Sequence, residues 1–218
     1  MSPRVSHSSE LVEVPEGDAG DAIVAALAAG GVDYVFFTSG SEICFYQEAI
    51  AKAAATGRPA PKLIVMTHEH ASLNAALGYS AVTGKPSATA AHVDAGTLHH
   101  GAAIHTTMHA HLPIIMTAGF PPTSATGSTR AARNTGAHLW LQETFDQHSV
   151  VRQYVKWDHH LTGHDDPGLQ VSRAIQVATS EPCGPVYLSV APEVSMAARP
   201  AGRFPSARAL GAATPPAP

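Results

Sequence analysis

The chain has 218 residues, a formal net charge of −4 and 14 histidines, against only 13 lysine and arginine residues. With so few basic residues, no stripe of positive charge is available to neutralise phosphates, which argues against nucleic-acid binding. Two cysteines exclude a disulfide framework and a four-cysteine zinc site, and no apolar run reaches the ~18 residues that span a bilayer.

Three segments differ in composition along the chain. Residues 1–18 are polar and lack periodicity, so we expect a tail or an added strand; they also lack the apolar core of a secretory signal, which favours a cytoplasmic protein. Residues 19–195 form the body. Residues 196–218 are rich in alanine and proline, and we expect them to be disordered or draped over a partner.

The body alternates helical and extended patterns. In chain order we predict a helix over 18–30, a strand over 33–38, a helix over 43–55, a strand over 62–67, a helix over 71–82, a strand over 87–93, a helix over 97–109, a strand over 112–118, an irregular loop over 121–136, helices near 141–152 and over 169–179, and a strand over 185–190. This order is typical of an α/β fold, a doubly wound and mainly parallel sheet with helices on both faces.

Ligands of such sheets bind beyond the carboxyl ends of the strands, which here marks residues 38–41, 67–70, 92–96 and 118–122. Glu69 follows one strand and opens a helix. It is either a positioned carboxylate for proton transfer or a charge that complements the helix dipole.

The histidines and cysteines offer weaker candidates. His105 and His109 have the i, i+4 spacing of helical metal ligands, but no carboxylate lies near them in the sequence, and we expect no metal site. Cys44 lies in an apolar stretch, which favours a core thiol over a nucleophile. The sequence has no P-loop, no dinucleotide fingerprint and no nucleophile elbow.

Several blocks together resemble one family. They are DAIVAALAAGGVDYVFFTSG at 21–40, His68-Glu69 with NAALGYSA at 74–81 and TGKP at 83–86, the strand and loop at 112–122, Gln142-Glu143 followed by Lys156, and EPCGPVYL at 181–188. Over residues 19–194 the chain resembles the pyrimidine-binding (PYR) domain of thiamine diphosphate enzymes of the acetolactate synthase and 2-oxo acid decarboxylase type.

The resemblance implies roles for particular residues. Glu69 would be the catalytic glutamate, which hydrogen-bonds a ring nitrogen of the aminopyrimidine and favours the imino tautomer that removes the thiazolium C2 proton. The residues implied at the cofactor are Ser39, Gly40, Glu69, His92, Gly96 and His99. Those implied at the substrate pocket are His99, His100 and Gln142.

The same resemblance implies a partner. Full-length members carry a diphosphate-binding (PP) domain whose GDG…N motif holds Mg²⁺, and these 218 residues contain no such motif. We therefore expect the PYR subunit of a split lyase or carboligase acting on a 2-oxo acid or related carbonyl, assembled as α2β2 or larger with a PP subunit that holds most of the Mg²⁺ contacts. The alternatives are a non-catalytic scaffold or regulatory protein of the same fold, and a metal-dependent hydrolase built on the histidines.

Overall fold

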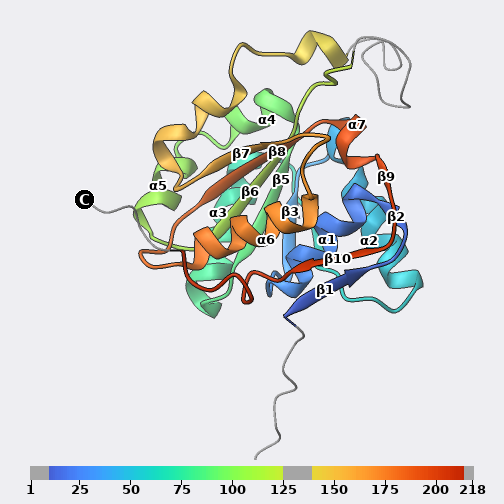
Figure 1. Ribbon diagram of the computed structural model, residues 1–218. Coiled ribbons are helices and arrows are strands. Elements are labelled where there is room, and N and C mark those ends of the chain that lie inside the picture. The colour runs from blue at the N-terminus through green and yellow to red at the C-terminus, as the bar shows by residue number, and fades with distance from the viewer. Residues whose placement is uncertain (1–9, 125–138, 214–218) are drawn as a thin grey trace, which may run out of the picture.

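A six-stranded parallel sheet forms the centre of the computed structural model, which describes residues 10–124 and 139–213 (Figure 1). The strand order is β4-β3-β5-β6-β8-β7, and every neighbouring pair is parallel. The strands are β3 (Tyr34–Phe37), β4 (Lys62–Val65), β5 (Ser87–Ala91), β6 (Ile114–Gly119), β7 (Asp158–Leu161) and β8 (Val186–Val190).

Helices cover both faces of this sheet, which confirms the predicted fold class. They are α1 (Ala19–Ala29), α2 (Phe45–Ala55), α3 (Glu69–Thr83), α4 (Val93–His99), α5 (Ala103–His109), α6 (Pro167–Thr179) and the short α7 (Pro192–Ser195). Among the residues described, no helix combines the length and apolarity needed to cross a membrane.

Two separate cores result from the alternation of side chains along each strand. On one face, Phe37 packs with Leu27 of α1 and Ile175 of α6. On the other, Phe36 packs with Leu73 of α3. Consecutive residues of β3 thus anchor opposite helical layers, and both layers hold the sheet in place beneath its ligand-binding edge.

The direction in which successive strands are added to the sheet changes at β3. After β3 the chain adds β4 on one side, and β5 then pairs with the other side of β3. The connections diverge at this point, and ligands of doubly wound sheets usually bind at the carboxyl ends of the strands where this happens. Here these are the ends of β3 and β5, from which the loops at Thr38 and His92 start.

The C-terminal segment was predicted to be disordered or draped over a partner, and this is wrong over 198–205, where it pairs with the chain's own N-terminal segment. The N-terminal segment does add strands, as expected. Phe204 is buried and packs so closely on α6 that only glycine fits at position 168. This apolar anchor and the strand pairing outweigh the polar composition that suggested a free tail. The antiparallel pairs are β1 (Leu11–Val14) with β10 (Gly202–Pro205) and β2 (Gly17–Asp18) with β9 (Ala198–Arg199), and Figure 1 shows β1 and β10 side by side.

The helix predicted over 97–109 is two helices. The first starts earlier, at Val93, and ends at His99. Gly101, with φ of +53°, turns the backbone before the second helix begins. A left-handed residue interrupts helical hydrogen bonding, so the continuous pattern in the sequence was misleading.

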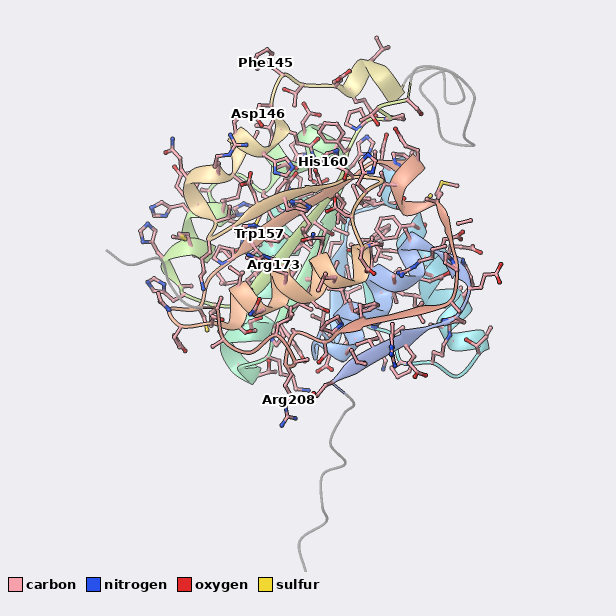
Figure 2. The ribbon with its side chains drawn as sticks, in the orientation of Figure 1. Phe145, Asp146, Trp157, His160, Arg173 and Arg208 are labelled. Carbon is pink, nitrogen blue, oxygen red and sulfur yellow. The ribbon has the colours of Figure 1, made fainter. Side chains whose placement is uncertain are left out.

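The helix predicted near 141–152 is also absent. Three 3₁₀ turns occupy this stretch: η2 (Leu139–Gln142), η3 (Gln147–Val150) and η4 (Arg152–Tyr154). Asp146 caps the second turn by accepting a hydrogen bond from the backbone N–H of Ser149, which favours a new start over continuation. Phe145, just before it, points away from the molecule (Figure 2). Residues 125–136 of the predicted loop lie outside the described residues.

Candidate functional site

Glu69 lies where β4 leads into α3, in the first turn of the helix. Its side chain is only 8 % exposed. The free N–H groups and the positive dipole end of α3 favour a carboxylate there. His68 precedes the helix, and its Nδ1 accepts a hydrogen bond from the backbone N–H of His70 at 3.1 Å. The segment thus holds a buried acid at the sheet's ligand-binding edge.

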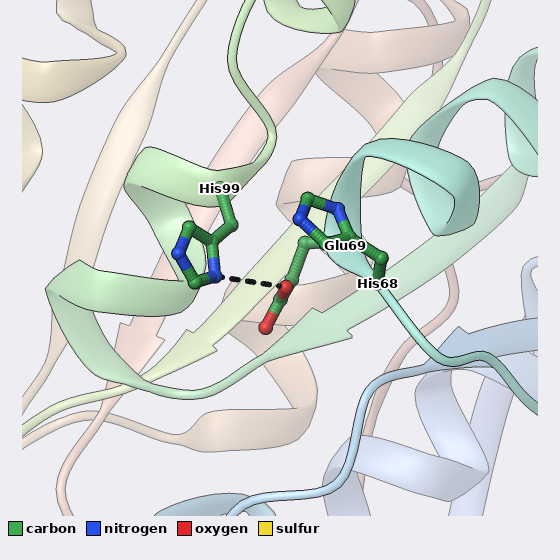
Figure 3. Close-up of side chains that lie close together, drawn as sticks. All are labelled: His68, Glu69 and His99. Carbon is green, nitrogen blue, oxygen red and sulfur yellow. Dashed lines mark ion pairs between the residues drawn. The ribbon is translucent and has the colours of Figure 1, made fainter.

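A glycine lets the backbone of α4 lie against this acid. A Cβ at Gly96 would be 3.0 Å from Glu69 Oε1 and 3.1 Å from the Cβ of Ala91. Three residues further along the helix, His99 Nδ1 lies 3.3 Å from Glu69 Oε2. Figure 3 shows the rings of His68 and His99 next to the carboxylate. The acid is therefore enclosed by backbone on one side and bordered by two imidazoles.

A second acid, Glu42, comes from the loop after β3 and is fully buried. Its Oε2 lies 2.6 Å from Nδ1 of His92, and this pairing raises the pKa of His92 above its usual value. On the other side of the ring, Gln142 Nε2 lies 2.7 Å from His92 Nε2. Rotating the amide by half a turn would present Oε1 instead, so Gln142 can pair with either the neutral or the protonated imidazole.

Two glycines make room for this row of side chains. A Cβ at Gly40 would lie 2.7 Å from His92 Nδ1, and one at Gly119 would collide with Glu42. Val93, directly after His92, has a φ of +24°, a conformation that β-branched residues rarely adopt. Backbone strain of this kind is often concentrated at functional sites.

The structure brings most of the predicted site residues together. Gly40, Glu69, His92, Gly96, His99 and Gln142 have the contacts given above, and Ser39 is exposed at the start of the same loop. His100 differs, because its side chain is fully buried, whereas that of His99 is 62 % exposed. Burial lowers the pKa of His100 to about 4. The two adjacent histidines therefore do not share one open pocket wall.

Glu42 is the site residue that the sequence analysis missed. Its signal was present, because it follows a glycine turn at the end of a buried strand, as Glu69 follows another strand. Its partner His92 follows a different strand, however, so the pair is visible only once the sheet order is known.

The structure also places Cys44 and the histidine pair on α5. Cys44 is exposed, so the expectation of a core thiol is wrong: Phe45 and Tyr46 occupy the buried side of α2 instead. His105 and His109 do lie together on α5, with ring centroids 4.3 Å apart. Among the described residues they belong to no group of three potential metal ligands.

Another polar cluster joins β7 to β8. His148 bridges Ser189 Oγ at 2.7 Å and Asp158 Oδ2 at 2.9 Å, and His160 Nδ1 lies 2.8 Å from the same Oγ. Serine, histidine and aspartate are in the order of a hydrolase triad. Ser189 is fully buried, however, so its hydroxyl is not presented to a substrate. The cluster satisfies buried polar groups along an edge strand that the sequence analysis missed.

Fold and site together define a doubly wound α/β domain with a buried glutamate beside a glycine at the carboxyl ends of its strands. The sequence model of the family described as "Thiamine pyrophosphate enzyme, N-terminal TPP binding domain" matches residues 17–150. The chain belongs to this family, which confirms the resemblance to a PYR domain.

Two curated relatives share parts of the sequence. Benzoylformate decarboxylase of Pseudomonas aeruginosa is 30 % identical over 129 residues, which are 59 % of this chain and 22 % of that protein. The 2-succinyl-5-enolpyruvyl-6-hydroxy-3-cyclohexene-1-carboxylate synthase of Arthrobacter sp. is 28 % identical over 188 residues, 84 % of this chain and 29 % of that protein. The chain thus spans less than a third of the length of either relative.

Two solved structures are similar to this chain over most of its length. The thiamine diphosphate-dependent 4-hydroxybenzoylformate decarboxylase of Rhodococcus jostii RHA1 superposes with a TM-score of 0.68 at 25 % identity, covering 92 % of this chain and 34 % of that one. A putative thiamin diphosphate-dependent enzyme of Mycobacterium smegmatis superposes with a TM-score of 0.68 at 23 % identity and shares the fold.

Proposed function

We propose that this chain supplies the pyrimidine-binding half of a thiamine diphosphate-dependent lyase or carboligase, acetolactate synthase-like in type, that acts on a 2-oxo acid or related carbonyl. The observation that carries the proposal is the buried Glu69 carboxylate at the switch-point edge of the sheet, with the Gly96 backbone beside it. Family membership supports the choice of cofactor.

The residues present fit an aminopyrimidine. A buried carboxyl group can donate its proton to a ring nitrogen, or as a carboxylate accept a strong hydrogen bond from a protonated ring nitrogen, and Glu69 offers such a group. Oε1 of buried Glu42 and Oε1 of Gln142 find no hydrogen-bond donor among the described residues, which leaves acceptor capacity unused beside His92. When bound, thiamine diphosphate supplies the electron sink for a carbanion.

Glu69 would hold or release a proton at the ring nitrogen of a bound aminopyrimidine. An amide in its place cannot exchange that proton and would prevent activation of the cofactor. This role requires only an acid that is buried and fixed in direction, and the first turn of α3 fixes Glu69 in that way.

His92 is a positioned ring rather than a free cation for a 2-oxo acid. Glu42 pairs with Nδ1 and raises the pKa of His92, and Gln142 occupies Nε2. Gln142 follows either protonation state by turning its amide, so it can hold the ring while a proton is gained or lost. Benzoylformate and 4-hydroxybenzoylformate, named in the titles of two relatives, are both 2-oxo acids and support this substrate class.

A partner completes the proposed site. The 218 residues contain no GDG…N motif, so the diphosphate and Mg²⁺ need a PP domain outside them, and we propose a second subunit in an α2β2 or larger assembly. Exposed apolar side chains next to site residues support a partner contact: Leu98 beside His99 is 57 % exposed, and Leu141 beside Gln142 is 65 % exposed. Exposed apolar surface of this kind is typical of interaction sites.

Exchange of the cofactor C2 proton with deuterium, measured by NMR in the assembled complex, tests the proposal. We expect Glu69→Gln to abolish exchange above the uncatalysed rate without unfolding the chain. The matched control is Glu48→Gln, an exposed residue of α2, which should exchange as fast as the wild type. Equal exchange in Glu69→Gln and wild type would contradict the role of Glu69, and a non-catalytic scaffold predicts that neither protein accelerates exchange.

A further inference from the structure

We propose that His68, Glu69 and His99 form a binding site for a divalent cation of the zinc class, and that the bound ion excludes the aminopyrimidine from Glu69. The cation site stands on the geometry of these three side chains alone. The exclusion rests on the proposed function.

The three side chains have the spacing of a metal site. Each offers a ligand atom, and these atoms all lie within 4.8 Å of one another. Glu69 Oε2 and His99 Nδ1 are 3.3 Å apart, which matches the roughly 3.3 Å between two ligands that lie about 2.0 Å from a tetrahedral ion. Two imidazoles and one carboxylate are a ligand set that zinc enzymes use, with the fourth position left open.

The arrangement leaves an ion free access. Glu69 is buried, whereas His68 and His99 are exposed and their rings stack with centroids 5.1 Å apart. In Figure 3 the two rings come from different elements, one from α4 and one from the residue before α3, and both lie beside the carboxylate. An ion can therefore enter from solvent, bind the acid and keep a water as its fourth ligand.

Binding changes the N-terminus of α3. His68 Nδ1 accepts the N–H of His70, which fixes the proton of the neutral ring on Nε2. An ion on Nε2 moves that proton to Nδ1, and an ion on Nδ1 displaces the N–H directly. In both cases the helix loses one capping hydrogen bond, and a positive ion at the positive end of the helix dipole adds a further cost, so coordination by Glu69 and the two imidazoles has to outweigh both.

The exposed pair His105 and His109 supplies a control within the same chain. Its rings are close, but the described residues place no third ligand with them. Two imidazoles alone bind a divalent cation more weakly than two imidazoles with a carboxylate, because the ion then lacks a neutralising charge.

Cobalt titration of the full chain without cofactor tests the cation site, since four-coordinate Co²⁺ absorbs visible light and Zn²⁺ displaces it. We expect one tight site. His68→Ala and His99→Ala should each weaken it at least about tenfold, because even outer-shell partners are worth about 10–100-fold. The double variant His105→Ala/His109→Ala should keep it. An absent site, or a site lost only in the double variant, would overturn the proposal.

Thiamine tests the exclusion, because it carries the aminopyrimidine without phosphates that would chelate the metal. Saturation transfer from the chain to the pyrimidine protons should vanish on adding one equivalent of Zn²⁺ and persist in His68→Ala. Transfer that survives in zinc-loaded wild type would overturn the exclusion. A chain that binds zinc at these residues but shows no transfer without zinc would count against the proposed function and the exclusion, while the cation site would stand.

Discussion

Replacing Phe204 by alanine removes the apolar anchor that ties β10 to α6. Phe204 is 1 % exposed, and its ring fills the space above Gly168. Truncating a buried phenylalanine costs about 3–5 kcal/mol, and we expect about 3 kcal/mol here because the two-stranded pair of β1 and β10 can shift into part of the cavity. For a chain of this size, about 2–4 °C per kcal/mol lowers the melting temperature by about 6–12 °C.

Thermal and urea unfolding followed by circular dichroism measure this loss. The matched control is Phe145→Ala, which makes the same chemical change at a fully exposed side chain and should shift the melting temperature very little. Equal melting temperatures for Phe204→Ala and wild type would refute the assignment of residues 202–205 to the folded domain.

The remaining predictions concern the site. Glu42→Gln should lower the pKa of His92 in an NMR titration. Because Glu42 raises that pKa in the folded chain, its stabilisation of the fold is complete below the ordinary pKa of 6.5 and is lost as the pH rises through the folded-state pKa. The variant should lack this pH-dependent stabilisation. Burial lowers the pKa of His100 from 6.5 to about 4, so between pH 7 and pH 4 the wild type should lose about 3 kcal/mol of unfolding free energy as this group takes up a proton on unfolding. His100→Leu should not show this loss. Equal urea midpoints for both proteins at both pH values would refute this. Alanine at His99 or Gln142 should raise KM or lower kcat with C2 proton exchange largely kept; wild-type kinetics in both variants would contradict their place at the substrate.

The spacing of apolar and polar residues along the sequence was enough to predict most strands of the parallel sheet. Strands such as β6 are buried along their whole length and read as apolar runs in the sequence. The edge strand β7 did not, because its residues Asp158, His159 and His160 are polar. Asp158 is paired with His148 of η3, His160 with Ser189 of β8 and His159 with Asp165, and the local sequence reveals none of these partners.

The strand ends predicted which side chains lie close together better than the residue types did. The carboxyl ends of parallel strands meet at one edge, so Glu69, His92 and Gly96 were expected together and are found together. The pairing of His92 with Glu42 and the burial of His100 depend on side-chain directions after the strands end, which no periodicity encodes.

Calorimetric titration of Mg²⁺ and thiamine diphosphate tests most directly the claim that this chain provides the pyrimidine half of a shared cofactor site. The chain alone offers Glu69 and a few polar groups but no phosphate-binding motif, so we expect weak binding and no turnover. Adding a PP subunit that carries GDG…N should produce tight, Mg²⁺-dependent binding. Tight binding with turnover by the chain alone, or no binding in the mixture, would contradict the account.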